Sequence, residues 1–177
     1  RAALSPAPRP GLDLLDRAIE LDGRYSKARL YRSWARSGAA RLDAAIADLD
    51  VGLTVAPLDQ TLLGLRAWLE ICTGDVRSGE ARAREGLERR PGAVGLAATA
   101  AIAASLLGRH DEAIKSLEGL RPAYPADPIL LSVLAYTQAA AKMTDKARGT
   151  LAELGPSARA PSIHAAAALL AIGEPKE

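Results

Sequence analysis

The chain has 177 residues, of which 49% are hydrophobic but only 3% are aromatic, and Phe is absent. This composition excludes a disordered tail and favours helices that pack closely through Ala and Leu. Lys and Arg total 23 against 21 acidic residues, so the net charge of +2 gives no field that points to nucleic acid or to a membrane surface.

The single cysteine, Cys72, excludes an intrachain disulfide and a cysteine-based zinc site. A lone thiol is typical of a reducing compartment, so we expect a cytoplasmic location, although it is also compatible with a periplasm. The longest apolar stretch, residues 94–107, is shorter than the ~20 residues that span a bilayer, so we expect no membrane insertion. The proline-rich segment 1–11 is expected to be a linker or a ragged terminus.

A 34-residue period organises the rest of the sequence. Prolines keep this step at Pro57, Pro91 and Pro125. Small residues keep it at Ala45, Gly79, Ala113 and Ala147, and we expect this buried column to let the second helix of each pair approach its neighbour closely. Leucines recur at Leu15, Leu49, Leu117 and Leu151, with Ala83 completing their column. Several columns that agree on one period indicate a repeat architecture.

The apolar periodicity predicts helices throughout and no strand. In chain order, the expected helices span residues 12–22, 26–39, 43–55, 59–73, 76–90, 93–107, 110–121, 127–141, 144–154 and 161–172. Gly74 and Gly108 follow apolar runs and are expected to end helices in the left-handed conformation. Aspartates at the starts of second helices are expected to cap them and to complement their positive ends: Asp43, Asp111 and Asp145. Asp127 is expected to cap the helix that Pro128 begins.

The segment GRHDEAI at 108–114, followed by a proline, resembles the tetratricopeptide repeat, as do DAAIADL at 43–49 and AIELD at 18–22. The resemblance covers nearly all of 12–177. It implies an all-α fold of about ten helices, in which antiparallel pairs stack into an α–α superhelix (a solenoid) with the first helix of each pair lining a concave groove. The implied units are a half repeat at 12–25, repeats at 26–59, 60–93, 94–127 and 128–158, and a truncated repeat at 159–177. Both ends look open, so we interpret the chain as an excerpt of a longer protein.

Some residues depart from the family pattern. Arg32, Arg36, Arg66 and Glu70 stand where the family usually buries apolar or small residues. Gly79 stands where an alanine is expected, and its place in the middle of a helix predicts that Gly79→Ala is neutral or mildly stabilising.

The sequence offers no constellation for catalysis. His110 falls at a helix junction, where a packing role is expected, and His164 has no metal-ligating neighbour at helical spacing. There is no glycine-rich phosphate loop and no nucleophile with a plausible base. We therefore expect no enzymatic activity, no cofactor, no metal and no small-molecule substrate.

Two features suggest a binding surface. Residues 24–41 contain no acid, and besides a lysine they carry a basic patch of Arg24, Arg29, Arg32, Arg36 and Arg41. This patch is either a solvated face or a surface that holds an acidic segment of a partner. The second feature is a column of large side chains, each 34 residues from the next: Trp34, Trp68, Ile102 and Tyr136.

The resemblance places this column toward the groove, whereas the alternative is that the rings fill gaps between helix pairs. The full set of residues that it places in a partner-binding groove is Lys27, Leu30, Tyr31, Trp34, Leu65, Trp68, Ile71, Thr99, Ile102, Ser132 and Tyr136. If Trp68 lines the groove, its ring is a binding anchor, so we expect Trp68→Ala to keep its fold and to lose affinity for the partner.

The leading hypothesis is a protein–protein interaction scaffold that holds a protein or peptide segment in its groove. The alternative is a regulatory or sensory repeat region of a larger signalling protein, such as a kinase or transcription regulator, in contact with further repeats or domains of the same polypeptide. A helical-repeat nucleic-acid binder is a third reading, disfavoured because the basic residues gather on one helix and do not recur in every repeat.

Overall fold

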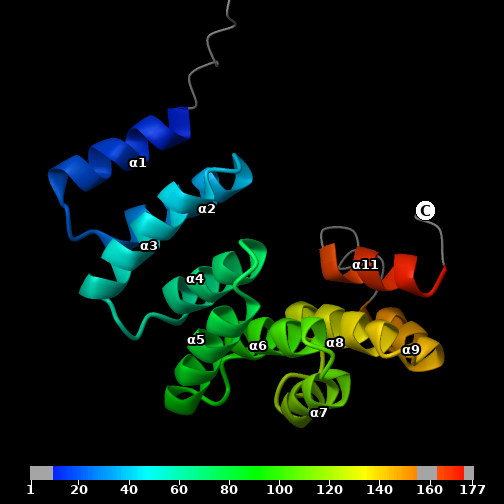
Figure 1. The fold of residues 1–177 in the computed structure, drawn as a ribbon. Coiled ribbons are helices and arrows are strands. Elements are labelled where there is room, and N and C mark those ends of the chain that lie inside the picture. The colour runs from blue at the N-terminus through cyan, green and yellow to red at the C-terminus, as the bar shows by residue number, and fades with distance from the viewer. Residues whose placement is uncertain (1–9, 155–162, 174–177) are drawn as a thin grey trace, which may run out of the picture. The chain divides into compact units, whose positions relative to one another are not determined.

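The computed structural model describes residues 10–154 and 163–173. Within these residues the chain forms ten α-helices and no strand (Figure 1). Their bounds are α1 Pro10–Leu21, α2 Ser26–Gly38, α3 Leu42–Val55, α4 Gln60–Cys72, α5 Val76–Arg89, α6 Val94–Leu106, α7 His110–Leu120, α8 Pro128–Ala140, α9 Thr144–Leu154 and α11 Ile163–Ala171. The predicted all-α class of sequential antiparallel helix pairs is confirmed. No helix in the described ranges is long and apolar enough to cross a membrane.

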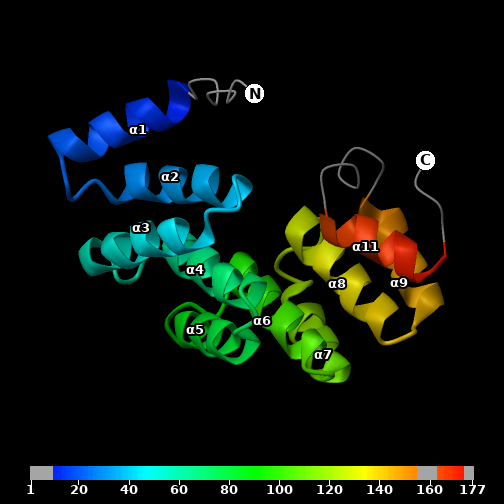
Figure 2. The same cartoon turned by 45° about the horizontal axis from the view of Figure 1, so that its top comes forward.

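The chain divides into two compact units, one up to Arg66 and one from Ala67, with the division inside α4. In the first unit α1 packs against α2 and α2 against α3, so the three helices lie side by side (Figures 1 and 2). In the second unit α6 packs against α5, α7 and α8, and α8 also packs against α7, α9 and α11.

The 34-residue period is visible in the backbone. The first helices of four pairs begin at Ser26, Gln60, Val94 and Pro128. After each of them, one residue adopts a positive φ: Ala40 (56°), Gly74 (95°), Gly108 (80°) and Lys142 (60°). The next residue then donates its N–H to a carbonyl five positions back, as Arg41 does to Arg36, which closes each helix in the same way.

The left-handed stops predicted at Gly74 and Gly108 are therefore confirmed. Ala40 and Lys142 hold the same conformation with a side chain, which costs roughly 1 kcal/mol each relative to glycine. Gly38 is the last residue of α2 and is not its left-handed stop. Helix α2 thus ends 34 residues before α4 ends, and the residues that follow the two helices are also 34 apart.

Small residues let the paired helices approach closely. The column of Ala45, Ala113 and Ala147 is at most 1% exposed, as predicted. Gly79 lies inside α5, also as predicted, but α4 passes so near that a Cβ atom there would lie 2.6 Å from the carbonyl oxygen of Ala67. The prediction that Gly79→Ala is tolerated is therefore wrong, because helix propensity cannot compensate for a backbone collision.

The helix starts follow the sequence only in part. Asp127 caps α8 as predicted, because its carboxylate accepts the N–H groups of Ile129 and Leu130. The predicted caps at Asp43 and Asp111 are wrong, since both residues lie inside the first turns of α3 and α7. Arginines that make no side-chain cap bond occupy those two cap positions, so these aspartates act through the helix dipole alone. Asp145 likewise lies inside the first turn of α9.

Candidate functional site

The outward face of α2 carries an exposed aromatic pair. Lys27, Tyr31 and Trp34 follow one another at steps of four and three residues, so they share one face of the helix. Tyr31 is 51% exposed and Trp34 is 49% exposed. Their ring centroids lie 5.7 Å apart in an edge-to-face arrangement. We call Lys27, Tyr31 and Trp34 the α2 stripe.

Two exposed arginines flank the α2 stripe. Arg24 lies in the turn before α2, and Arg41 directly precedes α3. Among the interactions within the described residues, neither side chain forms an ion pair, and the same is true of Lys27. These three cations of the predicted binding surface therefore face solvent.

The other predicted patch arginines point toward an acid of the chain itself. Asp48 of α3 is 3% exposed and receives two hydrogen bonds from Arg32 and one of 2.7 Å from Arg36. Arg29 lies 3.8 Å from the same carboxylate, and Arg32 also binds Asp16 of α1 at 2.6 Å. The hydrogen bond with Asp48 raises the pKa of Arg32 above its ordinary value. The patch is thus divided: three arginines neutralise an internal acid, and only Arg24 and Arg41 remain at the surface.

This pairing explains why the charged residues that depart from the family pattern are tolerated. Arg36 and Asp48 are 12 residues apart, and the equivalent positions one repeat later hold Glu70 and Arg82, which pair through two 2.9 Å hydrogen bonds with the charges exchanged. Two repeats further on, the Thr150 hydroxyl donates to Gln138 at 2.8 Å. Arg66 similarly repeats the role of Arg32 by binding an aspartate 16 residues earlier, Asp50, at 2.7 Å. Polar pairs therefore link the two helices of a repeat, or neighbouring repeats, with at least one largely buried partner in each pair.

Most predicted groove residues of the second unit are buried. Thr99, Ile102 and Ser132 are 8%, 5% and 2% exposed, because the Ala-rich helices α6 and α8 pack closely together. Trp68 is half-buried and packs against the cluster that contains Ile102. Tyr136 is half-buried against the cluster that joins α8, α9 and α11.

Burial divides the predicted partner-binding set. Five of its members are buried in this structure: Leu30, Ile71, Thr99, Ile102 and Ser132. Leu65, Trp68 and Tyr136 are half-buried, and only Lys27, Tyr31 and Trp34 are well exposed. The repeat phase identified positions on the first helices, but it could not show that neighbouring helices cover them.

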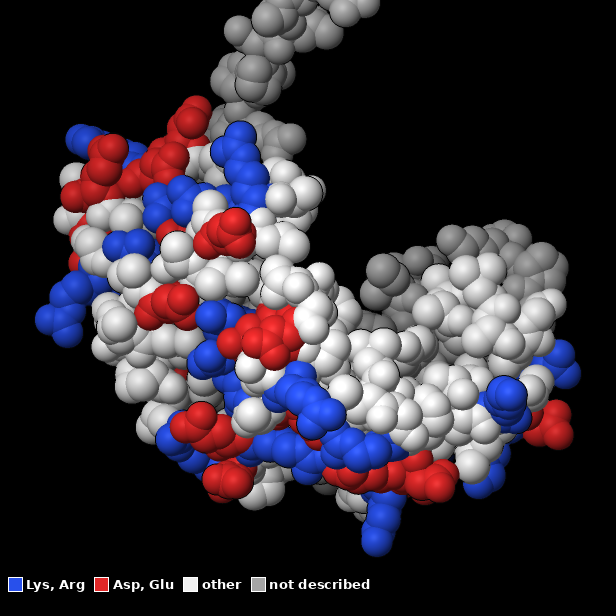
Figure 3. Space-filling view, viewed as in Figure 1, with Lys and Arg blue, Asp and Glu red and all other residues white. Residues whose placement is uncertain are grey.

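Charge is segregated in the second unit. Helices α6, α8 and α11 contain no Lys, Arg, Asp or Glu, whereas α5, α7 and α9 carry many. Figure 3 shows charged side chains gathered over α5 and α7 and an uncharged surface over α8 and α11.

Four charged side chains link α5 to the start of α7. Glu80 accepts hydrogen bonds from Arg84 and Arg109, and both arginines also bind Glu112. Burial alone would raise the pKa of Glu80, but the bonds from Arg109 and Arg84 outweigh it, so this pKa is lowered. The bond from Arg84 likewise lowers the pKa of Glu112. The cluster stabilises the junction between two successive repeats.

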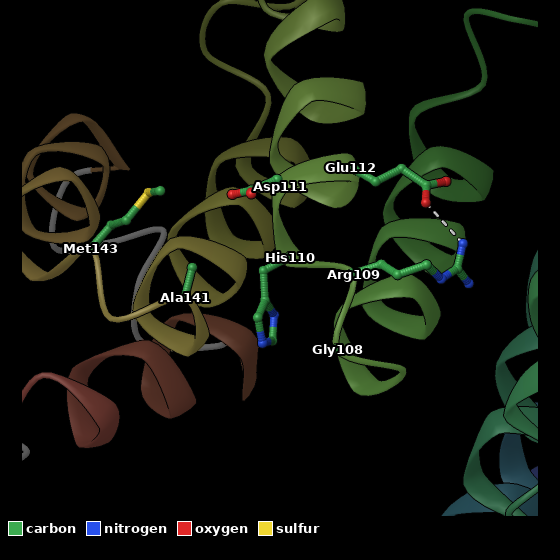
Figure 4. Close-up of a pocket in the computed structure, with 7 residues that line it drawn as sticks. All are labelled: Gly108, Arg109, His110, Asp111, Glu112, Ala141 and Met143. Carbon is green, nitrogen blue, oxygen red and sulfur yellow. Dashed lines mark hydrogen bonds and ion pairs between the residues drawn. The ribbon is translucent and has the colours of Figure 1, made fainter.

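An open depression of about 470 Å³ lies beside this cluster (Figure 4). Its lining residues are Gly108, Arg109, His110, Asp111, Glu112, Ala141 and Met143. The His110 Nδ1 atom lies 2.9 Å from the hydroxyl oxygen of Ser105, which is only 3% exposed. Because that hydroxyl is shielded from any substrate, the contact orients a junction histidine and does not form a nucleophile–base pair. Among the described residues no group of His, Cys, Asp and Glu is arranged to hold a metal ion.

Comparison with known proteins identifies the fold. No protein-family model matches the sequence, and no curated protein matches it either. Among solved structures, TTC0263, a thermophilic TPR protein of Thermus thermophilus, is similar with a TM-score of 0.74 and 18% identity over 90% of this chain and 89% of its own. PilW, a type IV pilus biogenesis factor, is similar with a TM-score of 0.74 and 16% identity, and the match covers 93% of this chain and 78% of PilW. YrrB, a TPR protein with an unusual peptide-binding site, is similar with a TM-score of 0.61 and 14% identity, and the match covers 90% of this chain and 84% of YrrB.

Proposed function

We propose, from the tetratricopeptide-repeat fold that the chain shares with these structures, that it binds a segment of a partner protein on the α2 stripe. The fold implies a protein–protein interaction scaffold, and proteins with this fold are typically not enzymes. The observation that carries the proposal is the exposure of Tyr31 and Trp34, each about half accessible on one helix face.

Tyr31 and Trp34 form an adjacent pair of exposed rings on one helix face, which is the kind of anchor that protein interfaces use. Tyr and Trp are enriched among the few interface residues that dominate binding energy, because each buries a large area and loses little conformational freedom. Elsewhere in the column of large side chains, Trp68 and Ile102 pack into helix clusters of the second unit. The α2 stripe therefore offers rings that no internal contact has already covered. The peptide-binding site named for YrrB supports such a role for this fold.

The proposal is tested by affinity capture from a lysate of the source cells. The parent chain is compared with a Tyr31→Ala/Trp34→Ala variant, and Tyr124→Ala serves as the control because that ring is also exposed, at 37%, but lies outside the α2 stripe. We expect the same proteins on the parent and the control, and their loss from the double variant. An identical set on all three chains would refute the proposal, provided that circular dichroism shows all three to be folded.

A further inference from the structure

We infer that the α2 stripe binds an acidic peptide segment that carries an apolar anchor, with the anchor on Tyr31 and Trp34 and acidic side chains beside Lys27 and the flanking arginines. This inference rests on the proposed function and adds the chemistry of the partner. The contacts that carry it lie within the first unit, and most involve a single helix.

The charge balance around α2 favours an acidic occupant. Residues 24–41 contain six cations and no acid. The internal carboxylate of Asp48 already holds Arg29, Arg32 and Arg36. Each of these arginines is at most 24% exposed in its side chain, so none of them offers a well-exposed group to a partner. Arg24, Lys27 and Arg41 remain exposed, and the exposed acids nearest to them in sequence, Asp22 and Asp43, lie outside α2. A basic segment placed over the stripe itself would therefore meet like charge at Lys27.

The spacing along α2 sets the layout of the segment. Lys27 lies one turn before Tyr31, and Trp34 follows within the next turn, so the stripe is about 11 Å long at 1.5 Å per residue. An extended peptide covers this length with about three residues, at about 3.4 Å each. Side chains two or four residues apart lie on the same side of an extended peptide. An acid at that spacing from an aliphatic or aromatic side chain therefore reaches Lys27 while the apolar side chain rests on the rings.

The same residue types also suit single-stranded nucleic acid, which uses cations and stacking rings. The short stripe argues against that ligand, because neither exposed rings nor basic side chains recur on α6 or α8, which contain no Lys or Arg. A peptide needs only one such anchor, whereas a nucleic-acid strand is held by a groove that follows several nucleotides. We therefore assign the stripe to an acidic peptide.

The probe is a displayed library of random peptides of about twelve residues, long enough to cover the stripe in extended form. The library is selected on the intact chain and sequenced before and after selection. We expect the enriched peptides to be acidic and to carry a Leu, Ile, Phe, Tyr or Trp two or four residues from an acid. Their binding is expected to weaken several-fold between low and physiological salt, because exposed charge pairs are screened.

Substitutions locate the binding. Arg24→Gln/Lys27→Gln/Arg41→Gln should weaken the enriched peptides at least tenfold, and Tyr31→Ala/Trp34→Ala should abolish their binding. The matched control is Arg77→Gln/Lys115→Gln/Lys146→Gln, which removes the same charge from three exposed side chains of the second unit and should leave affinity unchanged. A second library arm, selected on Lys27→Glu, should enrich acids less strongly than selection on the parent, because one of the three exposed cations is replaced by an anion. All variants are compared at the same folded fraction by circular dichroism.

The outcomes separate the two proposals. Two results would overturn the acidic assignment but keep the α2 stripe as a peptide site. In the first, the selected peptides need Tyr31 and Trp34 but show no acidic bias. In the second, they bind the triple Gln variant of the stripe as tightly as the triple Gln control. Enrichment that survives Tyr31→Ala/Trp34→Ala would overturn both proposals, as would a selection that enriches no peptide. Tighter binding of an oligothymidylate than of the enriched peptides, sensitive to the same variants, would assign the stripe to nucleic acid instead.

Discussion

Gly79→Ala is the sharpest test of how closely the helices pack. A Cβ at this position would lie 2.6 Å from the carbonyl oxygen of Ala67 and 2.7 Å from Cγ1 of Ile71. The first obstacle is backbone, so α4 and α5 must move apart. Overpacking of this kind costs typically about 1–3 kcal/mol, and the higher helix propensity of alanine offsets about 1 kcal/mol of it. Because the nearest obstacle is a backbone atom that cannot rotate away, we take the upper part of the overpacking range, about 2–3 kcal/mol, and expect a net loss of about 1–2 kcal/mol.

The assay is thermal and urea unfolding followed by helical circular dichroism, with a matched series of Gly→Ala variants. For a chain of this size the loss corresponds to a fall in melting temperature of roughly 2–8 °C. Gly149→Ala is the control, because Gly149 lies in α9 and nothing stands within 4 Å of its Cβ position. It should stabilise by about 0.5–1 kcal/mol. Gly86→Ala should fall between the two, since its obstacle is the flexible end of Leu96.

Equal stabilisation by Gly79→Ala and Gly149→Ala would refute the reasoning. It would mean that α4 and α5 do not approach as closely as the structure shows. Reduced helicity at low temperature in Gly79→Ala alone would instead agree with local separation of the two helices.

The other predictions concern the left-handed stops, the tryptophans and the ion-pair cluster. Ala40→Gly and Lys142→Gly should each raise the free energy of unfolding by roughly 0.5 kcal/mol in urea titrations. Glycine relieves the strain at positive φ by more than it adds entropy to the unfolded chain. A loss of stability in both variants would contradict this. Trp34→Ala should leave the melting temperature nearly unchanged. The structure revises the sequence expectation for Trp68→Ala: because this ring packs against a core cluster, its removal should cost about 2 kcal/mol of stability, and the reverse order of the two variants would contradict the assigned exposures. The folded-state pKa of Glu80 lies below its ordinary 4.5, so its ion pairs stabilise the fold above that pH and the contribution is lost as the pH falls through the folded pKa. Acid titrations of melting temperature should therefore fall less steeply for Glu80→Gln than for the parent, and identical slopes would count against the cluster.

Much of the fold follows from the sequence because the repeat period fixes several residues at once. The columns at Ala45, Ala113 and Ala147 predicted buried close contacts, and the structure confirms them. Gly79 belongs to the same column, yet its tolerance was predicted wrongly. The period reports which residues are equivalent, but the 2.6 Å approach to Ala67 depends on how near two particular helices come.

The candidate site was harder to predict, because exposure depends on what covers each helix. Trp34 and Ile102 occupy equivalent positions, but one is 49% and the other 5% exposed. The basic patch was misread in part because Asp48, the acid that holds three of its arginines, lies on the next helix. A signal was present in the sequence: Arg36 and Asp48 stand 12 residues apart, and Glu70 and Arg82 repeat that spacing with exchanged charges.

The central claim is that a partner segment lies on the α2 stripe, and amide hydrogen exchange tests it most directly. The intact chain is measured with and without the tightest acidic peptide recovered by selection. We predict slower exchange in α2, Ser26–Gly38, and in the adjoining turns, with α6 and α8 unchanged. Protection confined to α6, α8 or α11, with none in α2, would contradict the account.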